Sequence, residues 1–279
     1  MTRRDFLKIT RNVAVGSALA GGLTATGYAT LFEPNRLKIS RVNVPIKRLP
    51  PGLDGLRIVL MSDFHLFPFT SADLIQKAIR QASTLQPDIA LFSGDFVYSE
   101  AEAAYELSPI LAQLNSKLGS FAVLGNHDHV KGAGIVQNAL ARSGIEVLNN
   151  RGVTLSIGPS GFYLAGVDSM AAGSPDVRAA FSDHRGNTPT LVLAHEPDAI
   201  DYYSQRAPID LQLSGHSHGG QIRLPGVGPI ILPPWGRRYP RGLYQVNDSQ
   251  LFTSQGIGTV DLPVRINCPP EIAEITLTG

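Results

Sequence analysis

The chain has 279 residues, of which 43% are hydrophobic, and this is enough for one large α/β domain or two small ones. Its net charge of +1 argues against bulk binding of nucleic acid, so no nucleic-acid partner is expected. Cys268 is the only cysteine, which excludes an intrachain disulfide and favours a small buried side chain.

The first 29 residues, 1–29, are predicted to direct export and not to form part of the fold. Arg3 and Arg4 stand in a Thr-Arg-Arg-Asp-Phe-Leu-Lys sequence, which matches the twin-arginine signal pattern. An uncharged stretch rich in Gly and Ala follows from residue 12 to residue 32. A plain N-terminal anchor is the alternative, because this stretch is about long enough to span a bilayer.

Small residues around Ala29 permit cleavage after that residue, but the sequence leaves open whether the signal is cleaved. The expected partner of this segment is the twin-arginine export machinery. The expected location is the periplasm or the outer face of the cytoplasmic membrane.

Residues 30–279 are predicted to form one domain, in which buried strands and helices alternate through the first half. Ser71 is a plausible cap for the first helix, Pro109 interrupts the second, and Gly144 ends the third. The predicted strands are residues 56–62, 88–93 and 121–124, and the predicted helices are residues 72–85, 102–118 and 134–142.

From residue 145 onward the pattern becomes rich in strands, and after Gly219 glycines and prolines separate short segments. No internal repeat or flexible linker divides the chain, which favours a single domain. The predicted strands here are residues 145–148, 153–157, 162–167, 190–194, 210–214, 242–246, 250–254 and 271–277.

Five short motifs follow predicted strands in chain order, and they contain residue types that bind metal ions. Ligands of α/β sheets bind outside the carboxyl ends of the strands, so these side chains are expected to converge. Two carboxylates, one amide and four imidazoles among them can converge on a pair of metal ions, a mixture that suits Mn, Fe or Zn more than Ca or Mg. The motifs are Asp63-Phe64-His65, Gly94-Asp95, Gly125-Asn126-His127-Asp128, His195 and Gly215-His216-Ser217-His218.

The order and spelling of these motifs resemble the calcineurin-like metallophosphoesterases over nearly the whole chain after residue 40. The resemblance implies an α/β fold, a four-layer α-β-β-α sandwich of two mixed sheets flanked by helices. It places a dinuclear metal site at the carboxyl ends of the strands. It also implies a metal-dependent phosphoesterase, and in particular a phosphodiesterase, that attacks phosphorus with a hydroxide held between the two metals.

The resemblance also implies roles for single residues. Asp95 would bridge two divalent metal ions, Mn, Fe or Zn. His127 would donate a hydrogen bond or a proton to the phosphoryl or leaving oxygen. Asp128 would hold the His127 imidazole and favour its charged form. The first metal would be bound by Asp63, His65 and His218, and the second by Asn126, His195 and His216.

Residues 191–198, 211–221 and 269–272 resemble, more narrowly, exported or membrane-associated phosphodiesterases of the YaeI/YkuE type. Members more often have Asn at the position of Glu196 and Thr at the position of Ser217. A related branch hydrolyses UDP-2,3-diacylglucosamine in lipid A synthesis, and that pyrophosphohydrolase activity is the alternative function. Outward export weighs against it, because the UDP-sugar is cytoplasmic. A non-catalytic surface binding module is the alternative of another class, and the complete ligand set speaks against it.

A basic and aromatic segment at residues 235–241 remains. Its guanidiniums are predicted to bind the phosphate of a substrate that is lipid-linked or presented at a membrane surface, because Arg matches phosphate oxygens in a bidentate way. The alternative is a solvated loop. The three arginines of the segment are Arg237, Arg238 and Arg241.

His129 and His184 match no motif and are expected at the surface. The sequence leaves open the natural substrate, the metals in use and the oligomeric state.

Overall fold

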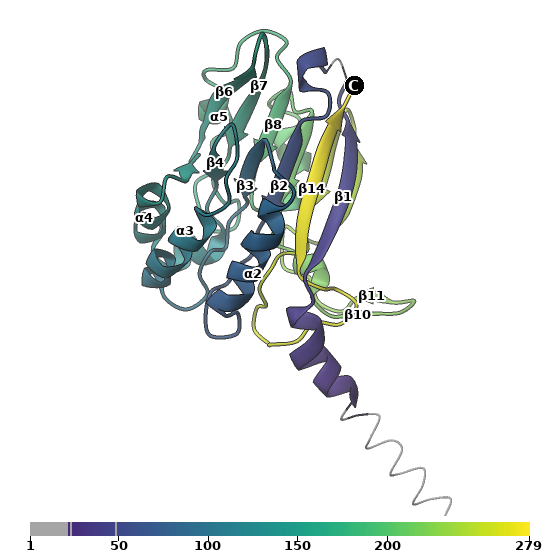
Figure 1. Cartoon of the computed structure of the whole chain (residues 1–279). Coiled ribbons are helices and arrows are strands. Elements are labelled where there is room, and N and C mark those ends of the chain that lie inside the picture. The colour runs from purple at the N-terminus through teal and green to yellow at the C-terminus, as the bar shows by residue number, and fades with distance from the viewer. Residues whose placement is uncertain (1–21, 23, 48) are drawn as a thin grey trace, which may run out of the picture.

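The computed structural model describes residues 22, 24–47 and 49–279, and two six-stranded sheets face each other in its body (Figure 1). The first sheet has the order β1-β14-β2-β3-β4-β5, and the second has the order β12-β13-β9-β8-β7-β6. Both sheets are mixed, because the pairs β14–β2, β6–β7 and β12–β13 are antiparallel and the other neighbours are parallel.

The strands of the first sheet are β1 (Lys38–Pro45), β14 (Glu271–Thr278), β2 (Arg57–Met61), β3 (Ile89–Phe92), β4 (Ser120–Ala122) and β5 (Glu146–Val147). Those of the second sheet are β6 (Arg151–Ile157), β7 (Ser160–Gly166), β8 (Thr190–Leu193), β9 (Leu211–Ser214), β12 (Gly242–Val246) and β13 (Ser249–Thr253). A separate hairpin pairs β10 (Arg223–Leu224) with β11 (Gly228–Pro229).

Helices cover the outer faces of both sheets, and the larger ones lie over the first sheet (Figure 1). These are α2 (Ala72–Ser83), α3 (Ala104–Leu111) and α4 (Asn126–Arg142), while α5 (Val177–Ala180) and α6 (Ile200–Tyr203) are single turns over the second sheet. Short 3₁₀ turns are η3 (Pro51–Leu53), η4 (Ala101–Ala103), η5 (Pro197–Ala199) and η6 (His218–Gly220).

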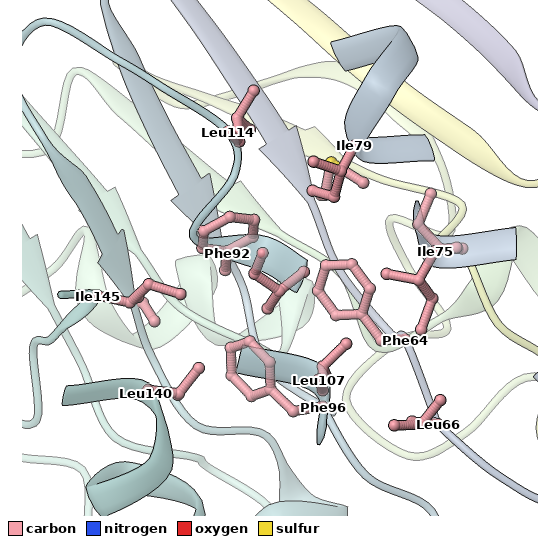
Figure 2. Packing of buried hydrophobic residues seen from close by; sticks show 14 of the residues in the cluster. Phe64, Leu66, Ile75, Ile79, Phe92, Phe96, Leu107, Leu114, Leu140 and Ile145 are labelled. Carbon is pink, nitrogen blue, oxygen red and sulfur yellow. The ribbon is translucent and has the colours of Figure 1, made fainter. Parts of the chain in front are cut away.

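Three apolar layers hold these elements together. Between the sheets, Leu60 of β2 packs in one cluster with Leu213 of β9. Under the helices, the rings of Phe64 and Phe96 stack at 5.7 Å between centroids (Figure 2). A third cluster around Tyr203 fills the outer face of the second sheet. Each large side chain fully buried in this way contributes about 1.5–3 kcal/mol. The predicted α-β-β-α layering is therefore confirmed.

Strand β1 was not predicted, because it lacks the apolar run of a buried strand. It lies at the edge of the first sheet, and Val44 is its only buried residue. The β10–β11 hairpin was also missed, since each of its strands has only two residues.

Two helices differ from their predicted bounds. The helix predicted at residues 102–118 ends at Leu111, and the chain then turns with the Ser116 hydroxyl donating to the Gly119 carbonyl. The helix predicted from residue 134 begins at Asn126 and is interrupted at Gly132, where φ is 145°. Its first turn was missed because the polar motif residues there hide the apolar periodicity.

A helical segment precedes β1 and comprises η1 (Tyr28–Phe32) and η2 (Glu33–Asn35). The Ala29 carbonyl accepts the Arg265 amide at 2.9 Å, and buried Glu33 accepts the Cys268 amide at 2.6 Å. The twin-arginine motif with Arg3 and Arg4 lies outside the described residues. None of the helices that the structure describes has the length and hydropathy to span a bilayer.

Candidate metal centre

The predicted ligands all follow strands that end at one edge of the sandwich. Asp63 follows β2, Asp95 follows β3, and Asn126 begins α4 directly after β4. From the second sheet, His195 follows β8, and the Gly-His-Ser-His motif follows β9. Because these strands are parallel within each sheet, their carboxyl ends present all of these side chains at one place.

The first ligand group consists of Asp63, His65 and His218, all of them buried. The Nε2 atoms of His65 and His218 are 3.0 Å apart, and His218 Nε2 is 3.6 Å from Asp63 Oδ1. The Ser62 hydroxyl donates to Asp63 Oδ2 at 2.6 Å and holds the carboxylate in place. This is the set predicted for the first metal.

The second ligand group consists of Asp95, His195 and His216. His195 Nε2 lies 3.2 Å from Asp95 Oδ2 and 3.2 Å from His216 Nδ1. Asn126 completes the predicted set, and its Oδ1 atom is buried without a hydrogen-bond partner among the described residues. A buried carbonyl oxygen without a donor is costly, and a cation would satisfy it. The donor set therefore fits a metal.

One carboxylate oxygen belongs to both groups. Asp95 Oδ2 is 3.4 Å from His65 Nε2 and 3.2 Å from His195 Nε2. The other oxygen, Oδ1, accepts the backbone amide of His127 at 2.9 Å. Asp95 is thus placed between the two groups, as expected of a bridging ligand.

Hydrogen bonds from the remaining ring nitrogens orient the second group. His195 Nδ1 lies 2.6 Å from the Ser93 carbonyl, and His216 Nε2 lies 2.8 Å from the Pro234 carbonyl. A carbonyl accepts the ring N–H and leaves the opposite nitrogen with its lone pair. The free lone pairs are therefore Nε2 of His195 and Nδ1 of His216, which face each other.

The backbone at the site is held in an uncommon conformation. Asp63, His65, Asp95, His216 and His218 all have φ between 43° and 68°. Left-handed conformations of residues other than glycine cost on the order of 1–3 kcal/mol each and gather at functional sites. The surrounding fold stabilises five residues in this conformation here. In each of them the conformation directs the side chain toward the shared centre.

Gly215 permits a close approach of two loops. A Cβ at this position would lie 2.5 Å from Asp63 Oδ2 and 2.6 Å from Ser62 Oγ. Any larger residue would push the His216 loop away from Asp63, whose carboxylate accepts the His216 amide at 3.0 Å. The absence of a side chain at Gly215 therefore allows the loop from the second sheet to pack directly against the loop from the first sheet.

Burial keeps the imidazoles of the first group neutral. It lowers the pKa of His65 to about 3 and that of His218 well below its ordinary value. Burial also raises the pKa of Asp63 to about 6. For His195, burial opposes the charged form, but the surrounding carboxylates, Asp95 foremost and then Glu196 and Asp63, together outweigh it and raise the pKa. Neutral imidazoles next to buried carboxyls form a set that a cation stabilises.

His127 lies at the border of the centre and not within its core. Its ring packs edge-on against His65 at 4.8 Å and stacks on Tyr98 at 5.3 Å. Its side chain is only partly buried and has no hydrogen bond to any residue that the structure describes. It lines the cavity of about 290 Å³ that opens beside the metal ligands. A phosphate ester in that cavity would be within reach of this imidazole.

The prediction that Asp128 holds the His127 imidazole is wrong. Its Oδ1 accepts the backbone amides of Phe96 and Val97 at 2.9 and 3.3 Å. Its Oδ2 accepts those of Asp95 and Gly125 at 2.9 and 2.8 Å. Both oxygens are therefore occupied by backbone donors, and Asp128 ties the Asp95 loop to the start of α4. Burial, and then the nearby Asp95 charge, raise the pKa of Asp128 to about 7.

The segment at residues 235–241 contacts the site through its backbone, since the Pro240 carbonyl accepts the hydroxyl of Ser217 at 2.6 Å. Arg238 pairs with Asp201 at 2.5 Å, and Arg241 lies 3.2 Å from the side-chain oxygen of Gln255. The cavity beside the metal ligands is lined by none of the three arginines. Their role in substrate binding, Arg237 included, stays a prediction.

Two important residues were missed. Arg265 is fully buried and donates to the carbonyls of Gln255, Gly258 and Cys268, which fixes the loop behind Asp63. Its single guanidinium in an apolar stretch was the only signal. His129, expected at the surface, lies 2.6 Å from Asp168 and is only 15% exposed.

Comparisons with known proteins agree with this geometry. Residues 56–220 match the family Calcineurin-like phosphoesterase, and this span contains all the predicted metal ligands. The chain is 35% identical to YkuE of Bacillus subtilis, an uncharacterized metallophosphoesterase, over 99% of this chain and 98% of that protein. It is 31% identical to phosphodiesterase YaeI of Escherichia coli over 99% of both chains.

The chain is also 30% identical to the UDP-2,3-diacylglucosamine pyrophosphatase LpxG of Chlamydia trachomatis, over 96% of this chain and 97% of that protein. Among solved structures, the sulfate thiohydrolase SoxB of Thermus thermophilus shares the fold, with a TM-score of 0.52 and 15% identity. That match covers 83% of this chain and 58% of SoxB. The family match extends over more than half of the chain, and two relatives share its whole length, so the chain belongs to the calcineurin-like phosphoesterases, hydrolases that act on phosphate esters.

Proposed function

We propose that this protein is a phosphodiesterase that requires two divalent metal ions, Mn, Fe or Zn, and acts at the outer face of the cytoplasmic membrane. The observation that carries the metal pair is the position of Asp95 Oδ2, which contacts a histidine of each ligand group. The relationship to YaeI, a named phosphodiesterase, supports the substrate class.

The residues of the site divide the work by position. Asp63, His65 and His218 would hold one ion, and His195, His216 and Asn126 would hold the other. When bound, the two ions activate water and neutralise charge on the phosphoryl oxygens. His127 stands at the cavity, where it donates a proton to the oxygen that leaves phosphorus.

The twin-arginine pattern of the sequence supports the proposed location. Arg3 and Arg4 form the pair expected of a twin-arginine signal, which delivers folded proteins across the membrane. An enzyme loaded with metal in the cytoplasm would keep its ions on this route.

The test is metal analysis together with two chromogenic substrates. The purified chain is expected to contain about two divalent ions, and to cleave bis-p-nitrophenyl phosphate faster than p-nitrophenyl phosphate. Chelation should abolish turnover, and one of the three metals should restore it. A faster reaction with the monoester would contradict a diesterase, and metal-loaded protein that is inactive on both esters would contradict the function.

Hydrolysis of UDP-2,3-diacylglucosamine is the second candidate. The identity to LpxG extends over nearly the whole chain, and the apolar side chains of Ile222, Ile231 and Leu262 line the same cavity as the metal ligands. Incubation with the UDP-lipid and chromatography of the products decide between the candidates, since only this activity releases UMP.

A further inference from the structure

An exposed aliphatic surface adjoins the metal centre. Val227, Ile230, Ile231 and Leu262 are exposed by 74%, 54%, 78% and 55%, and we name them the apolar rim. Within the described part of the chain, only six Leu, Ile or Val side chains are more than half exposed, and four of them form this rim. Such a concentration of exposed apolar area marks an interaction surface.

The apolar rim is continuous with the metal cavity. Ile230, Ile231 and Leu262 line the cavity together with His65 and His218. The lining of the cavity therefore combines metal ligands with aliphatic side chains that are exposed to solvent. A ligand that joins a phosphate ester to an apolar body would match both parts of this lining.

The rim is held in place by the fold. The Gln221 side chain donates to the carbonyls of Val260 and Leu262 at 3.0 and 3.1 Å, and its oxygen accepts the Val260 amide at 2.9 Å. The Ile230 amide donates to the Ile222 carbonyl at 3.1 Å. Gln221 comes three residues after the ligand His218, so the rim keeps its position relative to the metals.

The N-terminal helix lies next to the rim. The Ala29 carbonyl accepts the Arg265 amide at 2.9 Å, and the following residue, Ile266, donates to the Gln221 carbonyl at 3.0 Å. The Ile266 carbonyl in turn accepts the Arg223 amide of β10 at 2.9 Å. Helix and β10–β11 hairpin therefore lie at one end of the molecule, as Figure 1 shows.

The exposed side chains of this helix have the same character as the rim. Leu31 is 74% exposed and Phe32 is 58% exposed, and they end an uncharged stretch that begins at residue 12. Arg36 and Lys38 follow and are exposed. Apolar side chains flanked by basic ones are typical of a segment that meets an anionic lipid surface.

We propose that the apolar rim docks on an anionic phospholipid bilayer beside the N-terminal helix, so that the metal cavity opens onto the headgroup phosphates. The inference deepens the proposed phosphodiesterase function and rests on it for the substrate, a phosphodiester that remains in the membrane. It assigns docking to the rim and not to residues 235–241, where Arg238 already pairs with Asp201.

The test places a fluorescent label on the apolar rim itself. Membrane binding by the N-terminus alone therefore cannot be mistaken for docking of the rim. The full-length Val227→Cys variant is labelled with an environment-sensitive fluorophore, since the native Cys268 is buried. Val130→Cys is the matched control, because Val130 is also aliphatic and 71% exposed but lies outside the rim. Metal content equal to that of the parent confirms that both labelled proteins are folded.

Vesicles of equal parts phosphatidylglycerol and phosphatidylcholine should shift the emission of the label at position 227 to the blue and leave the label at position 130 unchanged. No shift at either position, or equal shifts at both, would overturn the proposal. In a second arm, Arg36→Gln/Lys38→Gln should weaken binding to these vesicles relative to phosphatidylcholine alone by about 30-fold at low salt. Equal binding of the two lipids by the parent would overturn the requirement for an anionic bilayer.

The failure of docking and the failure of the enzymatic function remain distinguishable. A parent protein that cleaves the soluble diester but shows no shift at position 227 refutes docking and leaves the phosphodiesterase intact. A blue shift at position 227 without hydrolysis of any diester refutes the substrate assignment but leaves the docking of the apolar rim on the membrane intact. A third variant, Val227→Asp, should lower hydrolysis of phosphatidylglycerol in vesicles at least tenfold relative to Val130→Asp.

Discussion

Asp95 Oδ1 accepts the backbone amide of His127 at 2.9 Å, while Oδ2 of the same carboxylate faces both ligand groups. The residue expected to bridge the metals therefore also positions the residue expected to donate the proton. The single side chain of Asp95 therefore fixes the position of His127 relative to the two expected metal sites.

Replacement of Asp95 by alanine removes both functions at once. We expect Asp95→Ala to lose at least one metal ion per chain and nearly all turnover of bis-p-nitrophenyl phosphate, because among the described residues no other side-chain oxygen contacts imidazoles of both groups. Elemental analysis and kinetics provide the measurement. Asp248→Ala is the control, since that carboxylate is 96% exposed. Normal metal content with normal turnover would refute the bridge.

Replacement of His127 separates metal binding from chemistry. His127→Ala should retain both ions while kcat falls by about 10²–10⁴, the range for removal of a general acid. His216→Ala is the comparison, and it should lose metal because His216 faces His195 within the second group. Because the His127 ring also lies near His65 and Asp95, metal content is the decisive readout. A loss of metal equal to that of His216→Ala would make His127 a ligand.

The backbone contacts of Asp128 predict a structural role that can be measured as stability. Asparagine has one acceptor oxygen, and its NH₂ group would face amide donors that the carboxylate now accepts. Asp128→Asn should reduce the free energy of unfolding by about 1–3 kcal/mol, as expected for a buried donor left unsatisfied. Denaturant unfolding of the chelated protein measures this. Unchanged stability with a large loss of kcat would restore the role of Asp128 as a partner of the His127 ring.

The His129–Asp168 pair predicts a dependence of stability on pH. The hydrogen bond that the His129 ring donates to the Asp168 carboxylate raises the pKa of His129 against the opposing effect of burial. For Asp168, burial opposes ionisation, but His129 together with the backbone amides of Ser174 and Ser169 outweighs it and lowers the pKa. The contribution of His129 is complete below its unfolded pKa of about 6.5 and is lost as pH rises through its folded pKa. That of Asp168 is present above about pH 4 and is lost as pH falls.

The contribution of this pair is therefore largest between about pH 4 and pH 6.5. His129→Gln should lower the free energy of unfolding by about 1.5–3 kcal/mol in that window, and by less at about pH 9, because the charged imidazole is lost as pH rises through its folded pKa. Urea titrations of both chelated proteins at the two pH values check the sign. A larger loss at the higher pH would contradict the charged pair.

The export prediction concerns residues outside the described part of the chain. Arg3→Lys together with Arg4→Lys keeps the charge but removes the paired guanidiniums that the export receptor is expected to read. The double variant should remain in the cytoplasm, folded and active, as cell fractionation and the diester assay would show. Unchanged export would identify the segment as an ordinary signal or anchor.

The sequence predicted the parts of this structure that depend on local patterns. Apolar runs located the buried strands β2, β3, β8 and β9, and the polar residues after them located the ligands, because burial and strand ends both leave a trace in the order of residues. The edge strand β1 leaves no such trace, since most of its side chains meet solvent. The role of Asp128 was out of reach for another reason. Its partners are backbone amides, which every residue type except proline offers.

The contact between Glu33 and Cys268 limits how far the N-terminus can be trimmed. Cleavage after Ala29 would remove the carbonyl that accepts the Arg265 amide but would leave the Glu33 carboxylate in place to accept the Cys268 amide. A cut beyond Glu33 would leave that buried amide without its acceptor, at a cost of about 1–3 kcal/mol. Cys268 would then be held less firmly, and its carbonyl accepts a hydrogen bond from the guanidinium of Arg265, which lies behind Asp63. We therefore expect a protein trimmed beyond residue 33, which loses the acceptors of both the Arg265 and the Cys268 amides, to be less stable than one cleaved after Ala29.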